Sequence, residues 1–199
     1  MSGFEEHSLP DQMLEIEQRS WLPRHVRGDK KAFEKLVRTY EQPIFSYLVR
    51  CGLNRQTRED LFQEIFMRIH RAADTYQPHR PLRPWLFTIS ANVVRNYFRS
   101  HKFNEVAETD IESQQPELDE TLAVCEALEW LEQAIPKLLP FGQAEVLILT
   151  TVNGLQQQDV ADILDMPLNT VKTQLSRARK TLTQAWLQRQ GQLPQGDTP

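Results

Sequence analysis

Hydrophobic residues recur at intervals of three and four positions along almost the whole chain. The segment from Phe33 to Leu48 shows this spacing, with Val37, Tyr40 and Ile44 between its ends. Such spacing gathers apolar side chains on one face of an α-helix, whereas the strict alternation typical of half-buried strands is missing. The pattern therefore predicts an all-α protein.

Capping residues and prolines indicate where the helices of the first half begin and end. We expect the helix over about 33–48 to be interrupted or kinked near Pro43, because proline lacks an amide donor. We expect the next helix to begin at Thr57, whose hydroxyl can cap the amide of Asp60. Three prolines close together then predict irregular backbone, followed by a helix over about 85–101.

The second half of the chain shows the same helical spacing after a change in composition. Residues 104–121 are acidic and polar and include Pro116, which is typical of a flexible linker. The sequence therefore predicts two small helical domains, 26–103 and 122–188, joined by an acidic linker over 104–121. The helices expected in the second domain cover about 122–135, 141–152, 156–164 and 168–188.

Composition excludes several classes of protein. No apolar run approaches the ~18 residues of a membrane span, and the N-terminus lacks the features of a signal peptide, so we expect a cytoplasmic protein without membrane insertion. Cys51 and Cys125 are far apart and in no metal-like spacing, so no metal or other cofactor is expected. The five histidines form no catalytic motif and no glycine-rich phosphate loop is present, so we expect no enzymatic activity.

Charge is distributed unevenly along the chain, although the formal net charge is only -4. Residues 31–103 hold thirteen Lys or Arg against six Asp or Glu, whereas residues 104–135 hold ten carboxylates and no Lys or Arg. The stretch LNTVKTQLSRARK, residues 168–180, has four cations and no carboxylate. Local basic segments on an acidic molecule point to nucleic acid as a partner of specific surfaces.

The basic stretch is part of a pattern that predicts a helix-turn-helix. In QQQDVADILDMPLNTVKTQLSRARKTL, a tight turn at 165–167 separates two short helices, and the small residue Ala161 stands where the helices would approach closely. Asn169 or Thr170 could cap the second helix. Its cations could simply stabilise the C-terminal half of a helix and keep the protein soluble. The preceding helix and the turn instead indicate a helix that binds in the major groove of DNA.

This block resembles region 4 of bacterial sigma-70 family RNA polymerase sigma factors, in particular the extracytoplasmic-function (ECF) group. The matching residues are ALEWLEQAIPKLLPFGQAEVLIL followed by GLQQQDVADILDMPLNTVKTQLSRARKTL. Asp165 and Asn169 stand where the family usually has glycine, and both residue types tolerate left-handed backbone. The resemblance implies that the minus 35 promoter element is bound by Thr170, Lys172, Thr173, Ser176, Arg177 and Arg179.

The stretch REDLFQEIFMRIH, residues 58–70, resembles region 2.2 of the same family, which docks on the β′ clamp helices of RNA polymerase. Leu61, Ile65 and Ile69 form the stripe expected to be buried. Taken alone, the opposite face is an ordinary solvated helix surface. The resemblance implies that core polymerase is contacted by Asp60, Gln63, Glu64 and Met67.

The stretch PWLFTISANVVRNYFRS, residues 84–100, resembles regions 2.3 and 2.4, which open and read the minus 10 element. The polar residues at i, i+3, i+4 and i+7 share one helix face, and Asn96 replaces an aspartate that is frequent in the family. The loop over 76–83 stands where the family forms a pocket for an everted base. The residues implied in minus 10 binding are His79, Arg80, Arg83, Asn92, Arg95, Asn96 and Arg99.

Together these motifs imply a sigma factor, which directs core RNA polymerase to promoters and helps open them. The partners implied are the polymerase core through its β′ clamp helices and β flap, promoter DNA, and an anti-sigma factor. The acidic linker would either follow the RNA path of the polymerase or act as a plain tether. The alternative is a stand-alone helix-turn-helix factor of the response-regulator type, but residues 1–121 show no alternating strands of a receiver domain.

Overall fold

The computed structural model describes residues 9–101 and 121–191, in which all regular secondary structure is helical. This confirms the predicted all-α class. The linker predicted over 104–121 lies outside the described residues except for its last position. The elements are α1 (Leu9–Val26), α2 (Lys30–Arg50), α3 (Arg55–Arg71), the 3-10 turn η1 (Ala73–Thr75), α4 (Leu82–Ser100), α5 (Thr121–Leu138), α6 (Phe141–Leu147), the π-helical turn η2 (Ile148–Val152), α7 (Gln157–Leu164) and α8 (Leu168–Arg189).

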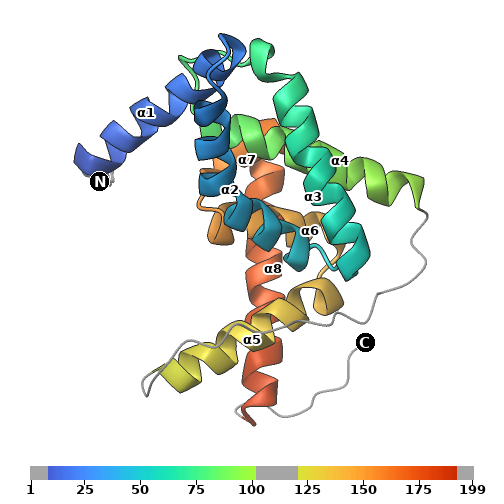
Figure 1. Ribbon diagram of the computed structural model, residues 1–199. Coiled ribbons are helices and arrows are strands. Elements are labelled where there is room, and N and C mark those ends of the chain that lie inside the picture. The colour runs from blue at the N-terminus through green and yellow to red at the C-terminus, as the bar shows by residue number, and fades with distance from the viewer. Residues whose placement is uncertain (1–8, 102–120, 192–199) are drawn as a thin grey trace.

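Helices α1 to α4 form the first bundle (Figure 1). Its core includes Ile44, Ile65 and Leu86, which are fully buried at the expected helical spacing. Trp21 and Leu22 near the end of α1 are buried in the same core, so α1 contributes to this bundle even though it precedes residue 26. The boundary predicted at residue 26 stays a prediction.

Two helices of the first bundle differ from the expectation. Helix α2 runs through Pro43 without interruption, and a kink at Pro43, the other outcome expected, stays a prediction. Helix α3 begins at Arg55 because the side chain of Asn54 accepts a hydrogen bond from the amide of Thr57 at 2.8 Å. The Thr57 hydroxyl, which we expected to cap the helix, lies instead 3.4 Å from the Tyr97 hydroxyl.

Helix α4 also begins earlier than expected, at Leu82, with Pro84 inside its first turn. Proline is tolerated there because the first amides of a helix have no intrahelical acceptor. The preceding loop is held by Tyr76, whose hydroxyl donates to the Arg80 carbonyl at 2.6 Å. The Tyr76 ring also packs edge-on against Trp85, at 5.4 Å between centroids.

Helices α5 to α8 form the second bundle, with the helix-turn-helix at α7 and α8. Asp165 in the turn has φ 51° and ψ 53°, which confirms the left-handed backbone expected at the first of two positions where the family has glycine. Asn169, the second position, is an ordinary helical residue of α8. The amide of Met166 donates to the Ala161 carbonyl at 3.0 Å, and the amide of Asp165 donates to the Asp162 carbonyl at 3.4 Å. This pair of bonds is a Schellman motif that ends α7.

Helix α8 begins at Leu168, as predicted, but its capping differs from the prediction. No side chain caps α8, and Pro167 stands directly before its first residue. The Pro167 carbonyl accepts the amide of Thr170 at 2.8 Å. Asn169 and Thr170, which we expected to cap this helix, are instead helical residues of α8.

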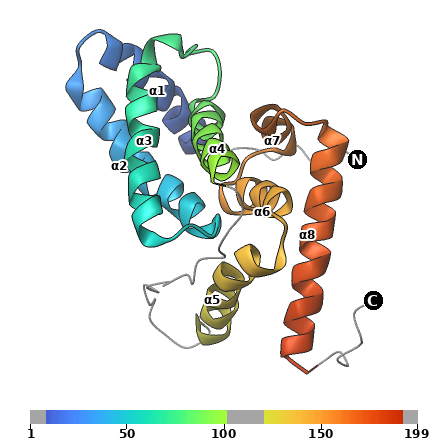
Figure 2. The same ribbon diagram turned by 90° about the vertical axis from the view of Figure 1, so that its right-hand side faces the viewer.

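The two bundles pack against each other. Figure 2 shows α7 beside α4, and α6 between α4 and α8. Glu145 of α6 lies in this contact with only 1% of its surface exposed. None of the helices in the described part of the chain combines the length and hydropathy that a membrane span requires.

Candidate polymerase and nucleic-acid interfaces

The residues predicted to contact polymerase share the outer face of α3. Asp60, Gln63 and Met67 are exposed, Met67 to 48%, while Glu64 is half-buried. Glu64 forms an ion pair with Arg68 at 2.6 Å, one turn further along the helix. The structure therefore presents these four side chains together, opposite the buried stripe of α3.

An aromatic pair continues this exposed surface onto α2. Phe45 of α2 is 37% exposed and meets Phe62 of α3 edge-on, at 5.9 Å between ring centroids. Neither residue was predicted as a contact from the sequence, because Phe45 is next to the buried Ile44 and belongs to the same apolar run. The exposed face thus combines carboxylates with apolar surface, the composition of many protein interfaces.

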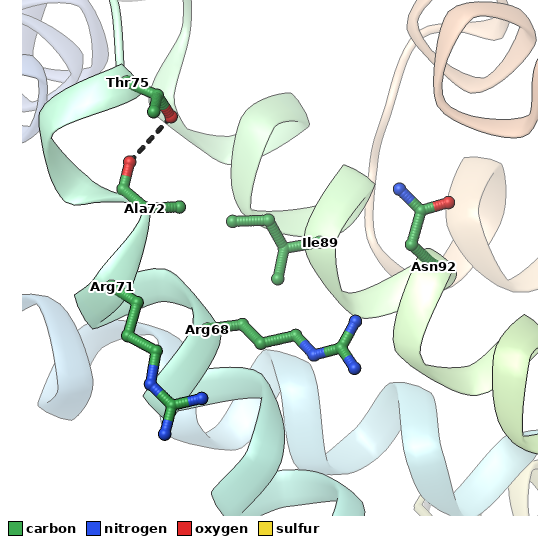
Figure 3. Close-up of a pocket in the computed structure, with 6 residues that line it drawn as sticks. All are labelled: Arg68, Arg71, Ala72, Thr75, Ile89 and Asn92. Atoms are coloured by element: carbon green, nitrogen blue, oxygen red, sulfur yellow. Dashed lines mark hydrogen bonds between the residues drawn. The ribbon is translucent and has the colours of Figure 1, made fainter.

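An open cavity of about 470 Å³ lies between the end of α3 and the middle of α4. Figure 3 shows Asn92 and Ile89 on α4, with Arg68 extending from α3 toward α4. The cavity therefore joins an amide, an apolar wall and cationic groups. Its lining consists of Arg68, Arg71, Ala72, Thr75, Ile89 and Asn92.

A pocket was expected at the proline-rich loop over 76–83, but no residue of that loop lines this cavity, which lies directly before it. Arg68 and Arg71 were missed as candidate site residues. The signal for them was present, because both are basic residues in the last turn of α3, which leads into the loop. Asn92 is the one predicted minus 10 residue in the cavity lining.

The remaining residues predicted for the minus 10 element divide into two groups. Asn96 and Arg99 are exposed on α4, and Arg99 donates to the Asn96 side chain at 3.1 Å. His79 and Arg80 are exposed in the loop. These four side chains are open to solvent, as a DNA contact requires.

Arg83 and Arg95 form the second group, because both are turned toward the second bundle. Arg95 donates to the Glu145 carboxylate at 3.1 Å and to the Leu164 carbonyl at 3.0 Å. Arg83 donates to the Asn153 carbonyl at 2.9 Å. The α4 face predicted to bind the minus 10 element therefore does not act as one surface, because Arg95 contacts the second bundle. Helical spacing alone does not reveal that contact.

The outer face of α8 carries the residues predicted for the minus 35 element. Val171, Leu175 and Ala178 are buried against α6 and α7, which leaves the intervening positions outward. Thr170 is half-buried, and its five predicted companions are exposed: Lys172, Thr173, Ser176, Arg177 and Arg179. The helix thus presents short polar groups and cations on one surface.

Ionisable groups that could form a metal site do not gather in the described residues, where no three of His, Cys, Asp or Glu come together. One buried ionisable cluster does exist at the contact between the bundles. There burial raises the pKa of Tyr47, of Cys51 and of Glu145 above the ordinary values of these groups. The Arg95 guanidinium acts in the opposite direction on the pKa of Glu145.

Both bundles match families of known proteins. The Sigma-70 region 2 family matches residues 36–103, and the Sigma-70 region 4 family matches residues 128–182. The first match covers α3 and α4, and the second covers the helix-turn-helix. The alternative of a stand-alone helix-turn-helix factor is not favoured, because it leaves the region 2 match unexplained.

Curated relatives extend the similarity over most of the chain. The RNA polymerase sigma factor YlaC of Bacillus subtilis is 32% identical over 160 residues, which cover 77% of this chain and 91% of YlaC. The RNA polymerase sigma-H factor of Pseudomonas aeruginosa is 27% identical over 186 residues, which cover 87% of this chain and 96% of that protein. The ECF sigma-E factor of Haemophilus influenzae is 25% identical over 179 residues.

Solved structures agree with these relatives. A structure of CnrH in complex with the cytosolic domain of CnrY has a TM-score of 0.66 and 25% identity, and it covers 85% of this chain and 97% of CnrH. The sigma factor RpoE of Bartonella quintana, in complex with the anti-sigma factor NepR, shares the fold at a TM-score of 0.60 and 23% identity. The chain therefore belongs to the sigma-70 family of RNA polymerase sigma factors, within its ECF group.

Proposed function

We propose that this sigma factor divides promoter recognition among three surfaces. The exposed face of α3 holds core polymerase, the cavity between α3 and α4 takes an unpaired base of the minus 10 element, and the outer face of α8 reads the minus 35 duplex. The observation that carries this proposal is that one bundle offers a hollow beside an exposed polar face, whereas the other offers a convex basic helix. A hollow suits a base removed from its stack, and a convex helix suits a groove.

The cavity lining matches the chemistry of an unstacked base. The Asn92 amide has both donors and an acceptor for the edge of a base, and the Ile89 and Ala72 side chains supply apolar contact for its face. Arg71, and Arg68 through the N–H groups that Glu64 does not use, would neutralise adjacent phosphates. Exposed His79 and Arg80, together with Asn96 and Arg99, would extend this contact along the strand.

The outer face of α8 matches the chemistry of a duplex. Thr173 and Ser176 can reach base edges near the start of the helix, while Lys172, Arg177 and Arg179 bind phosphates. Each surface makes few contacts by itself. Because polymerase carries both bundles, the second contact becomes intramolecular and the two affinities reinforce each other.

Polymerase binding would use Asp60, Gln63, Glu64 and Met67 on α3 against the β′ clamp helices, and region 4 against the β flap. An anti-sigma factor is a further expected partner, because RpoE is seen with the anti-sigma factor NepR and CnrH with the cytosolic domain of CnrY. We place the protein in the cytoplasm, where polymerase acts. It would contribute binding and strand opening and no covalent chemistry.

The proposal is tested by comparing DNA binding with and without core polymerase. Gel-shift titrations use a promoter fragment with the protein alone, with core alone and with both together. Specific binding is expected only in the third mixture, because an acidic chain with small basic surfaces binds DNA weakly alone. Sequence-specific binding by the protein alone would contradict the proposal and favour a stand-alone transcription factor.

A further inference from the structure

Two histidines join α1 to α3 on the surface of the first bundle. The Nε2 atom of His25, in the last turn of α1, lies 2.9 Å from the Nδ1 atom of His70, in the last turn of α3. At this distance one ring donates a hydrogen bond to the other. The bond therefore fastens the end of one helix to the end of another, across 45 positions of the sequence.

Phe33 of α2 packs against both imidazole rings. Its ring centroid lies 4.6 Å from that of His25 and 5.4 Å from that of His70, and the two imidazole centroids are 4.9 Å apart. His25 is half-buried, and its Nδ1 atom is buried without a hydrogen-bond partner among the described residues. Below, the histidine latch means His25 and His70 together with Phe33.

The hydrogen bond of the latch depends on protonation. A bond between two imidazole nitrogens needs a lone pair on one of them, and an imidazolium has none. The bond is therefore kept while at most one ring is charged, and it is lost when both are charged. A charged His25 ring must also carry a proton on its buried Nδ1 atom, which has no acceptor there.

The surroundings of the latch oppose its second proton. Burial lowers the pKa of His25, and the charge of His70 lowers it further. Arg24, next to His25, is paired with Asp29 at 2.7 Å. The other charged side chains of the adjoining turns are mostly cations: Arg27 after α1, Lys30, Lys31 and Glu34 at the start of α2, and Arg71 and Asp74 after His70.

The sign of the pH dependence follows from this lowered pKa. The folded protein binds a proton on His25 less tightly than the unfolded chain does, whose histidines titrate at about 6.5. The contribution of the latch to stability is therefore fully present above about pH 6.5 and is lost as the pH falls below that value.

The latch is connected directly to the cavity between α3 and α4. His70 is followed by Arg71 and Ala72, which line the cavity, and Thr75 of η1 lines it further along the same segment (Figure 3). Helix α1 also packs against η1. His25 and Phe33 precede residue 36, where the match to the region 2 family begins, so the latch ties a helix outside that match to the cavity wall.

We propose that the histidine latch is a proton-sensitive device that positions the last turn of α3, and that its second proton loosens α1 and impairs capture of the minus 10 base. The inference rests on the proposed function of the cavity. The loosening of α1 does not depend on that function, so the two parts are tested by separate measurements.

The test uses substitutions of His70, which is exposed and outside the cavity lining. His70→Asn places an amide near the position of Nδ1, where it can donate to His25 or accept from it at any pH. His70→Ala removes the bond at every pH. His101→Asn makes the same chemical change at an exposed histidine directly after α4 and is the matched control.

Hydrogen exchange of the full-length chain, without polymerase, measures the latch itself. Amides of α1 and of the last turn of α3 are compared with those of His70→Asn at the same pH, which cancels the intrinsic pH dependence of exchange. At about pH 7.5 the natural protein should match His70→Asn, and at about pH 6.0 it should exchange faster by about twofold or more, toward the rate of His70→Ala. His101→Asn should behave like the natural protein at both pH values.

Permanganate reactivity of minus 10 thymines, measured with holoenzyme, tests the consequence for the cavity. The ratio of reactivity at about pH 6.0 to that at about pH 7.5 should be lower by about twofold or more for the natural protein than for His70→Asn, because only the natural latch opens. Since core polymerase is common to both mixtures, its own pH dependence cancels in this comparison. Circular dichroism at neutral pH checks that each variant keeps its helix content.

Three results would overturn the proposal. In the first, exchange of α1 has the same pH dependence in the natural protein and in His70→Asn. In the second, His101→Asn removes that pH dependence as fully as His70→Asn does. In the third, α1 loosens on acidification but strand opening responds equally in both proteins. A failure of the cavity's function would differ from all three, because the natural holoenzyme would then open no promoter even at neutral pH, whereas the exchange result would stand.

Discussion

The left-handed residue in the turn between α7 and α8 gives a sharp prediction about stability. Asp165 is exposed, its φ is 51°, and its backbone completes the Schellman motif that sets the angle between the two helices. Left-handed backbone costs an ordinary L-residue about 1–2 kcal/mol, less for aspartate and nothing for glycine. Asp165→Gly should therefore stabilise region 4 by up to about 1 kcal/mol, and Asp165→Val should destabilise it by about 1–2 kcal/mol.

An aspartate in the last turn of α7 supplies the control. Asp162 is also exposed but lies within α7, where its carboxylate accepts a hydrogen bond from Gln158 at 3.1 Å. Glycine in a helix costs entropy, and the side-chain bond is lost, so Asp162→Gly should destabilise by about 0.5–1 kcal/mol. The same chemical change is thus expected to have opposite signs at positions 162 and 165.

Urea unfolding followed by circular dichroism at 222 nm measures both changes. In thermal unfolding, a change of about 1 kcal/mol in the stability of a domain of 60–100 residues corresponds to a shift of about 4–8 °C in its melting temperature. Destabilisation of equal size by Asp165→Gly and Asp162→Gly would refute the reasoning. It would mean that the backbone of Asp165 is not held in the left-handed region in solution.

Three further predictions concern the functional surfaces. Arg177→Ala should weaken holoenzyme binding to minus 35 duplexes of any sequence, and should reduce the slope of log affinity against log salt concentration by about 1 in filter-binding titrations. The control is Arg189→Ala, which removes a cation paired with Glu126 and should leave this slope unchanged. Asn92→Ala should abolish the permanganate reactivity of minus 10 thymines, which reports strand opening, while the protein still co-purifies with core polymerase. Loss of co-purification would contradict the assignment of Asn92 to DNA contact. Because burial raises the pKa of Glu145 above its ordinary 4.5 where it faces Tyr47, Cys51 and Arg95, the folded protein binds this proton more tightly than the unfolded chain does. The natural protein should therefore gain stability relative to Glu145→Gln as pH falls from neutral toward 4.5, and lose this gain as pH rises through the raised pKa. An equal pH dependence of urea unfolding in the two proteins would refute this.

Features set by local spacing could be predicted from the sequence. The buried stripe of α3, the outward face of α8 and the tight turn at 165–167 each follow from residues within a few positions of one another. The left-handed backbone at Asp165 was expected from the family resemblance. Helix starts were predicted less well. Asn54 and Thr57 are both good caps, and only the backbone shows that Asn54 accepts the amide of Thr57 and so starts the helix two residues earlier than expected.

Features set by contacts between distant segments could not be predicted. Arg95 has the same spacing on α4 as Asn92 and Asn96, yet it is turned away by Glu145, fifty positions further along the chain. The cavity likewise needs the end of α3 and the middle of α4 to be brought together, so the basic last turn of α3 could point to Arg68 but not to its place in the cavity lining. Neither arrangement leaves a periodic signal in the sequence.

The central claim is that this chain gives core polymerase its choice of promoter through two separately held DNA surfaces. The most direct measurement is transcription by core polymerase on fragmented genomic DNA, with the 5′ ends of the products mapped. The account predicts discrete start sites that appear only when the protein is added and that share two upstream elements at a constant spacing. Start sites that are the same without the protein, or that share no upstream elements, would contradict it.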